Sequence, residues 1–230
     1  MADIVTNKRN CLVGPRAGLS RKDFHAHWSG QHAKFARELP GLIWYVQNHY
    51  LRTLWRTPGF EEHSEGLAEL AYADGAAIVG NIQNWSGLGE LLEDEARFLG
   101  MWTGCWTNLP ADAASPAQRR ILIQLIRPEA VPPAEFSARV AAAAAAIRNV
   151  LPCSTEETLN KLVRERPVLE CHTWPDWFIF VELPVAGDFA ALLSPEGPVL
   201  RHVNGLTDRG VAYLVYAEAK RLPVDLAAAG

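Results

Sequence analysis

The chain has 230 residues and a formal net charge of −4, with 49% hydrophobic and 21% charged residues. These values are typical of a globular protein with one large or two small domains. Because the chain has no run of Lys and Arg and no apolar run long enough to span a bilayer, we expect neither a nucleic-acid partner nor a membrane segment.

Cysteine usage and the N-terminus predict a cytoplasmic protein. Cys11, Cys105, Cys153 and Cys171 are scattered without the close pairs that metal or redox sites use, so we expect free thiols in a reducing compartment and no zinc site. The first nine residues contain no long apolar segment of the kind that directs secretion.

The first half of the chain alternates strand and helix signals. We expect a strand at residues 9–13, a helix at 19–39, a strand at 42–51, a loop at 52–64, a strand at 67–72, helical structure at 75–83 and 88–99, and an edge strand at 102–109. Residues 110–118 are rich in Ala, Asp, Ser and Pro, which predicts a domain linker.

The helix expected at residues 19–39 is the most informative element. Ser20 and Asp23 suit its N-terminus, and Pro40-Gly41 ends it. At about 100° per residue, its inward face spans roughly 140° and carries apolar and polar groups together: Phe24, His27, Trp28, Gln31, His32, Phe35 and Leu39. Buried polar groups need partners, so these are bonded to backbone carbonyls or line a cavity that a ligand shares, and we favour the cavity.

The pattern begins again in the second half. We expect a strand at residues 120–126, a helix at 132–150, strands at 168–172 and 177–183, helical structure at 189–203 and a strand at 210–218. Phe24 and Ser86 are 62 positions apart, and their counterparts Phe136 and Ser194 are 58 apart. The sequence therefore predicts an α+β fold of two ferredoxin-like β-α-β-β-α-β repeats, with domains at residues 1–113 and 114–230.

Several motifs of the first half carry a family resemblance. They are Phe24-x-x-His27-Trp28-x-x-x-His32, Leu39-Pro40-Gly41-Leu42-x-x-Tyr45-x-Gln47-Asn48-His49, Gly66-Leu67-Ala68-Glu69-Leu70 and Leu92-Glu93-Asp94-Glu95-x-x-Phe98. With these motifs, residues 8–108 resemble the EthD family of the dimeric α+β barrel superfamily. The resemblance implies two ferredoxin-like sheets packed into a barrel, here within one chain, and a pocket between each sheet and its own helices.

Proteins of the superfamily that this chain resembles include lyases or dehydratases, cyclases, cofactor-free monooxygenases, lactone isomerases and haem enzymes. In the second half, Arg139, Val140 and Ala144 stand where the first half has His27, Trp28 and His32. We therefore expect one site of this kind per chain. His172 beside Glu170 and His202 after Arg201 are weaker candidates for a second pocket.

Histidine acid–base chemistry is the mechanism that these residues favour. His32 is the first choice for the base and His27 the second, and a regular helix would place them about 140° apart, which disfavours a shared metal. Tyr45 or Asn48 would hold a developing oxyanion, although strand alternation puts them on opposite faces. We expect the substrate to contact Trp28, Gln31, Phe35, His49 and Glu69, with Glu69 and Glu95 as candidate partners that orient a histidine.

The function predicted from the sequence is a cofactor-independent lyase of the dehydratase type, acting on a small hydrophobic or aromatic oxygenated metabolite. The alternatives are a cofactor-free monooxygenase, cyclase or isomerase of the same superfamily, or a non-catalytic ligand-binding accessory protein. We expect no metal or other cofactor, because the sequence contains no phosphate-binding loop and no clustered ligands. Assembly of the tandem chain into a homodimer is left open.

Overall fold

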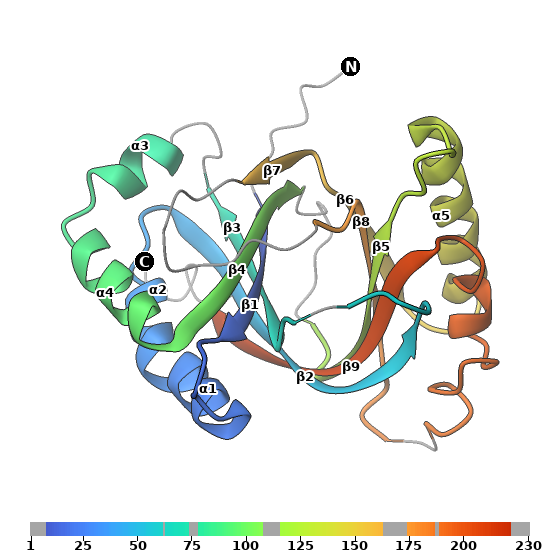
Figure 1. Cartoon of the computed structure of the whole chain (residues 1–230), viewed down its shortest axis with the longest axis horizontal. Helices are drawn as coiled ribbons and strands as arrows, with labels where there is room; N and C mark the ends of the chain where they lie inside the picture. The colour runs from blue at the N-terminus through green and yellow to red at the C-terminus, as the bar shows by residue number, and fades with distance from the viewer. Residues whose placement is uncertain are drawn as a thin grey trace.

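The computed structural model describes residues 8–61, 63–73, 78–107, 116–162, 174–186 and 189–221 (Figure 1). Its elements in chain order are β1 (Lys8–Pro15), α1 (Arg21–His27), the π-helical turn η1 (Trp28–His32), α2 (Ala33–Ala36), β2 (Leu42–Arg56), β3 (Gly66–Tyr72), α3 (Ile78–Gln83), α4 (Leu88–Phe98), β4 (Leu99–Thr107), β5 (Arg119–Ile126), α5 (Pro133–Arg148), β6 (Cys153–Glu157), β7 (Asn160–Leu162), β8 (Trp177–Glu182), the 3-10 turn η2 (Leu200–His202) and β9 (Arg209–Arg221).

The strands form one antiparallel sheet that curls around an interior (Figure 1). Its nine described strands run in the order β6-β8-β5-β9-β2-β3-β1-β4-β7. The two end strands, β6 and β7, follow one another in the chain, and Leu159 between them donates its backbone N–H to the carbonyl of Trp106 on β4. The sheet therefore bends far enough for its two ends to meet.

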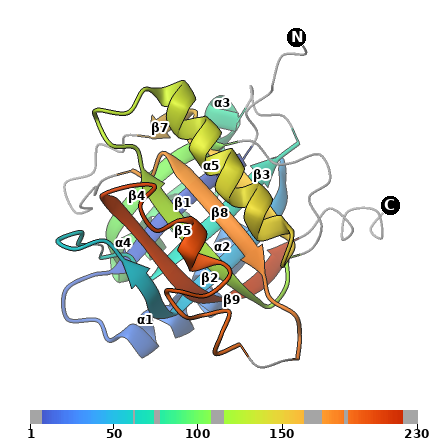
Figure 2. The same cartoon turned by 90° about the vertical axis from the view of Figure 1, so that its right-hand side faces the viewer.

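Helices cover the outside of this sheet on two sides. In Figure 1, α1, α2, α3 and α4 lie on the left and α5 on the right, and Figure 2 shows α5 running alongside β8. Phe24, Trp28 and Phe98 belong to one apolar core, which packs the first helices on β1–β3. Phe136 and Val140 belong to a second core, under α5, and a third core that includes Leu122 and Phe180 fills the inside of the curled sheet.

The mixed α+β class and the antiparallel sheet are confirmed, and several elements differ from expectation. The helix at residues 21–36 is interrupted by the turn η1. β2 extends through Arg56 into the expected loop, because β9 pairs with it as far as Arg56. β4 is not an edge strand, because β7 pairs with it. Most of residues 189–203 form turns, with only η2 as a helical turn.

Strand β6 was not predicted, and it occupies the place beside β8 that the expected strand at 168–172 would have taken. That expected strand, with Cys171 and the candidates Glu170 and His172, lies outside the described residues, as does most of the predicted linker. Within the described ranges, no helix is both long and apolar enough to cross a membrane.

Candidate functional site

A carboxylate shared by two histidines forms the centre of the candidate site. Asp94 on α4 is 1% exposed, and its two oxygens contact two different imidazoles. His27 Nε2 lies 2.8 Å from Oδ1, and His32 Nδ1 lies 3.0 Å from Oδ2. Because an ionised carboxylate only accepts hydrogen bonds, each of these ring nitrogens donates an N–H.

The turn η1 explains why the two histidines meet. On a regular α-helix, residues five apart diverge by about 140°. In a π-helical turn the hydrogen bonds run from residue i to residue i+5, so His27 and His32 come onto one face. The predicted separation of these two side chains is therefore wrong. Insertions of this kind often occur at functional sites.

Charge and tautomer follow from this arrangement. Burial alone would raise the pKa of the Asp94 carboxyl, but the hydrogen bonds from His32 and His27 outweigh it and hold that pKa below its ordinary value. With Nδ1–H bonded to Asp94, the lone pair of His32 lies on Nε2. His32 is thereby oriented to accept a proton, as a general base requires.

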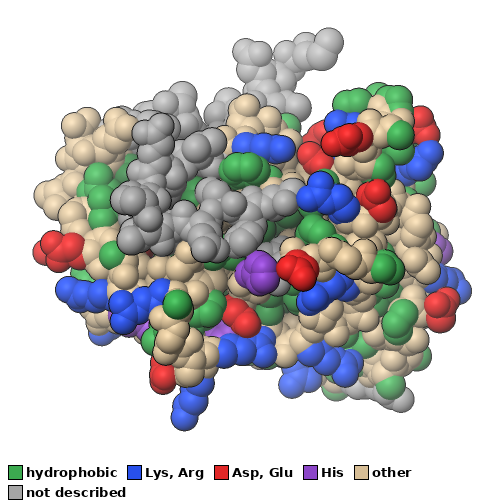
Figure 3. All heavy atoms as spheres, in the orientation of Figure 1, with side chains coloured by type: hydrophobic (Ala, Val, Ile, Leu, Met, Phe, Trp, Pro, Cys, Tyr) green, Lys and Arg blue, Asp and Glu red, His purple; other side chains and the backbone are tan. Residues whose placement is uncertain are grey.

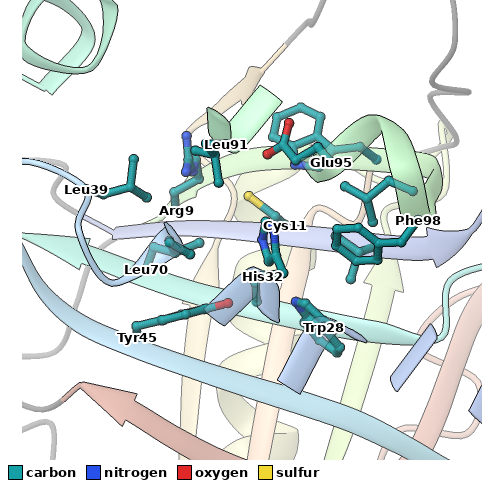
Figure 4. Close-up of a pocket in the computed structure, with 15 residues that line it drawn as sticks. Arg9, Cys11, Trp28, His32, Leu39, Tyr45, Leu70, Leu91, Glu95 and Phe98 are labelled. Carbon is teal, nitrogen blue, oxygen red and sulfur yellow. The ribbon is translucent and has the colours of Figure 1, made fainter. Parts of the chain in front are cut away.

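The cavity beside His32 is small and mostly apolar (Figure 4). Its volume is about 30 Å³, enough for one or two water-sized molecules. Apolar walls come from both helices and strands, including Trp28, Leu91, Phe98 and Trp102. Its polar lining residues are Arg9, Cys11, His32, Tyr45 and Glu95.

Two of these polar residues can bind an oxygen atom. The Tyr45 hydroxyl accepts a hydrogen bond from Gln47 Nε2 at 2.6 Å, and burial raises the pKa of this phenol, so it keeps its proton and can donate it. The Arg9 Nε atom is buried and has no hydrogen-bond partner among the described residues. An unpaired guanidinium N–H is costly in such surroundings and would be satisfied by a ligand oxygen.

Most of the other residues predicted to bind substrate lie elsewhere. Trp28 lines the cavity, but Gln31 is exposed and Phe35 packs against the first apolar core. His49 lies outside the cavity, with its Nδ1 2.9 Å from Nδ1 of His25. His202, the weaker candidate, makes a 3.4 Å contact with the neighbouring Arg201.

Asn48 and Glu69 face the inside of the curled sheet rather than the helices. Asn48 Nδ2 donates to Glu69 at 2.8 Å, and Glu69 pairs with Lys8 at 2.6 Å and with Arg120. Lys8 also pairs with Glu156 on β6. Strand alternation accounts for this separation, because Tyr45 and Gln47 point to the helices while Asn48 points away. Neither Asn48 nor Glu69 lines the cavity that holds His32.

Asp94 and Arg9 are the residues that sequence reasoning missed. Asp94 lies in an i, i+3, i+4, i+7 pattern with Leu91, Glu95 and Phe98, so its place on the buried face of an amphipathic helix was a readable signal. We assigned the orienting role to Glu69 or Glu95, whereas the contacts belong to Asp94. Arg9 gave a weaker signal, since it is one of two adjacent charged residues, with Lys8, at the start of β1.

Comparison with known proteins supports the fold. Residues 16–101 match the model of the EthD domain family, and no curated protein matches the sequence. A candidate monooxygenase from Lactobacillus acidophilus is 12% identical, with 94% of this chain and 96% of that chain covered and a TM-score of 0.50. An anthrone oxidase-like protein is 10% identical, with 96% of each chain covered and a TM-score of 0.55. A candidate monooxygenase from Fusobacterium nucleatum is 7% identical, with 93% of each chain covered and a TM-score of 0.53.

These comparisons correct the functional prediction. Two of these similar structures are named as monooxygenases and the third as an anthrone oxidase-like protein, and none of the three is named as a lyase. These names contradict the predicted dehydratase-type lyase and fit the monooxygenase alternative better. At these identities the likeness extends to the fold alone.

Proposed function

We propose that the chain is a cofactor-independent monooxygenase with His32 as its base. The observation that carries this proposal is the Asp94-oriented His32 beside a cavity with Tyr45 and Arg9 on its walls. The descriptions of structures with the same fold support the reaction class. The substrate class that suits these groups is an aromatic ketone with an acidified CH2 group on the same ring system.

Proton removal from carbon is the step that the histidine serves. His32 Nε2 takes one proton from the CH2 group, and Asp94 stabilises the imidazolium that forms. The negative charge moves onto the ketone oxygen, where the Tyr45 hydroxyl and the Arg9 guanidinium can hold it. His27, on the other Asp94 oxygen, helps to fix the carboxylate.

The resulting carbanion can react with dioxygen without a cofactor, because it supplies the electrons itself. It reduces dioxygen and combines with it to form a peroxide at the same carbon. Loss of water, with removal of the second C–H proton, leaves a carbonyl group. In the overall balance, one CH2 group and one molecule of dioxygen give one carbonyl group and one molecule of water, so each product receives one oxygen atom.

The cavity volume sets a condition on this proposal. About 30 Å³ accommodates dioxygen but not an aromatic ring system. Binding of the ring therefore requires wall side chains to move, and Leu91 and Phe98 on α4 are on that wall. We expect slow binding of the aromatic substrate relative to diffusion, since conformational change lowers association rates.

Oxygen uptake with anthrone as the probe tests the proposal. We expect uptake above the rate with heat-denatured protein, and with ¹⁸O-labelled dioxygen one labelled atom in the quinone and one in water. His32→Ala should lower turnover by about 10²-fold, whereas His202→Ala, which is not among the cavity-lining residues, should leave it unchanged.

The same assay distinguishes the alternatives. Uptake should persist after exhaustive chelation and dialysis, and uptake restored only by an added metal or flavin would contradict cofactor independence. Tight binding of anthrone without oxygen uptake would favour a ligand-binding accessory protein. Equal turnover by wild type and His32→Ala would remove His32 from the mechanism.

We also propose that the two halves are ferredoxin-like repeats with a boundary near residues 113–114. In support, the four main strands of the first half run in the order β2-β3-β1-β4, and β6-β8-β5-β9 of the second half follow the same pattern. This arrangement leaves the candidate site in the first half alone, because Arg139 and Ala144 replace its histidines.

A further inference from the structure

A groove separate from the cavity lies beside the first turn of α1. Its volume is about 540 Å³, and its lining comes from α1, β2 and β9. It shares no lining residue with the small cavity. Trp28 stands between them: its ring lines the cavity and lies 4.6 Å from the ring of His49, which lines the groove.

The walls of this groove suit a flat apolar group. Leu51 is 46% exposed and Tyr216 37% exposed, which is unusual for large hydrophobic side chains in the described part of this chain. Tyr216 on β9 is the cross-strand partner of His49 on β2, and Tyr50 and Leu51 follow directly. Both strands of the β2–β9 pair therefore present exposed apolar surface to the same groove, through Leu51 and Tyr216.

The charges that line the groove are all positive. They belong to Arg21 and Lys22, and no Asp or Glu is among the described lining residues. Arg21 is held by Glu65 at 2.6 Å and by the carbonyl of Tyr50, whereas Lys22 forms no ion pair with any described residue. Figure 3 shows basic side chains gathered along the lower edge of the molecule, where α1 and the middle of β2 and β9 lie in Figure 1.

The two imidazoles in the groove are uncharged at neutral pH. Burial, the adjacent His49 and Arg21 lower the pKa of His25 to about 4, and burial lowers that of His49 to about 4 despite Glu218. Their Nδ1 atoms are 2.9 Å apart, so one ring donates to the other. The pair therefore forms a neutral, fixed surface against which an aromatic ring can pack.

We propose that this groove is a second ligand site, for a small aromatic carboxylate whose ring lies on Leu51 and Tyr216 and whose charge is paired with Lys22. The apolar patch supplies area for the ring, and the cationic rim supplies charge complementarity for the carboxylate. The site is independent of the oxygenation proposed above, because none of its residues lines the cavity that holds His32.

Calorimetric titration with a matched pair of probes tests the site. The probes are 2-naphthoate and the neutral 2-naphthylmethanol, which present the same ring with and without the charge. We expect 2-naphthoate to bind about fivefold more tightly, the difference that one partly exposed ion pair provides. Lys22→Gln should abolish this difference, and Leu51→Ser should weaken both ligands about threefold or more.

Three further variants locate the binding. Lys34→Gln changes an exposed lysine of α2 outside the groove and should leave both affinities unchanged. His32→Ala and Arg9→Gln should also leave them unchanged. Loss of 2-naphthoate binding in Arg9→Gln with retention in Lys22→Gln would place the ligand in the cavity and overturn the proposal. Equal affinity for the two probes, or binding of neither, would overturn it as well.

Discussion

Asp94 is the residue on which the candidate site depends, because it is the one side chain of the described structure that bonds to ring nitrogens of both His27 and His32. A carboxylate accepts from both rings, whereas an amide accepts at one atom and donates at the other. An amide would therefore favour the wrong tautomer on one histidine.

We expect Asp94→Asn to lower turnover by about 10²-fold or more while KM changes little. The substitution favours the wrong tautomer of a histidine, whereas the apolar walls of the cavity that bind the substrate are retained. Steady-state kinetics with anthrone measures this. Glu93→Gln, an exposed neighbour on the same helix, serves as the control and should keep full activity. Equal losses in the two variants would contradict a specific role for Asp94.

The same carboxylate predicts a dependence of stability on pH. Its pKa in the folded protein lies below the ordinary value of 3.8, so ionised Asp94 stabilises the folded state above that pH. The contribution is lost as pH falls through the lowered pKa. Urea unfolding should therefore show Asp94→Asn less stable than wild type at pH 7, with a gap that narrows below about pH 4. A gap that is constant with pH would contradict this linkage.

At the scale of elements, the turn η1 and the strand β3 hold Trp28 in place. A Cβ atom on Gly66 of β3 would come within 2.3 Å of the Trp28 ring and 2.9 Å of the Asn48 carbonyl oxygen. Neither neighbour can yield, since Trp28 is 1% exposed and the carbonyl belongs to the sheet. A Cβ atom on Gly30 of η1 would meet only open space, and the φ angle of Gly30 is not positive.

We expect Gly66→Ala to destabilise the protein by about 1–3 kcal/mol through overpacking. Gly30→Ala should stabilise it by about 0.5–1 kcal/mol, because alanine restricts the unfolded chain more than glycine does. Thermal unfolding of the two variants gives a direct comparison. Similar melting temperatures for both would show that Trp28 moves more freely than its packing indicates.

At the scale of the whole molecule, a buried ionic network joins the two halves inside the sheet. Lys8 of β1 is 1% exposed and pairs with Glu69 of β3 and with Glu156 of β6. Burial would raise the pKa of Glu69, but Arg120 and Lys8 outweigh it and lower that pKa to about 2, so the carboxylate stays ionised. Arg120 comes from β5, so each half supplies charges of both signs.

We expect Lys8→Met to destabilise the protein by about 3–5 kcal/mol, because it leaves two buried carboxylates short of their partner. Adding Glu156→Gln to Lys8→Met should recover part of the loss. Lys34→Met, at an exposed position, should stay within about 0.5 kcal/mol of wild type. Urea unfolding measures the free energy of unfolding of all three variants. If Lys8→Met lost no more stability than Lys34→Met, this role of the network would be contradicted.

The contacts between the two halves also predict how a fragment of residues 1–113 behaves. β2 pairs with β9 from Tyr45 to Arg56, and the third apolar core contains residues from both halves. Residues 1–113 alone would expose this strand edge and this apolar face. We expect the fragment to dimerise or to be insoluble in size-exclusion chromatography. A stable monomer would contradict the proposed division into two dependent halves.

The sequence by itself determined most elements of the first half and the alternation of side chains along its strands. Ser20 accepts the backbone N–H of Asp23 at the start of α1, as capping chemistry predicts. Period-two alternation separated Tyr45 from Asn48 correctly, because side-chain direction on a strand follows from backbone geometry alone. Which of the two faces the histidines was left open by these local rules, and only the structure places Tyr45 beside His32.

Only the tertiary structure decided which side chains meet. The π-helical turn brings His27 and His32 to Asp94, 67 and 62 positions away along the chain, and no local propensity reports a contact over that distance. β6 was missed because its Cys-Ser-Thr-Glu-Glu sequence has little apolar character, and its place comes from pairing with β8 and from Glu156 bonding to Lys8. Both outcomes depend on long-range contacts, whose free energy depends on neighbours that a local pattern does not contain.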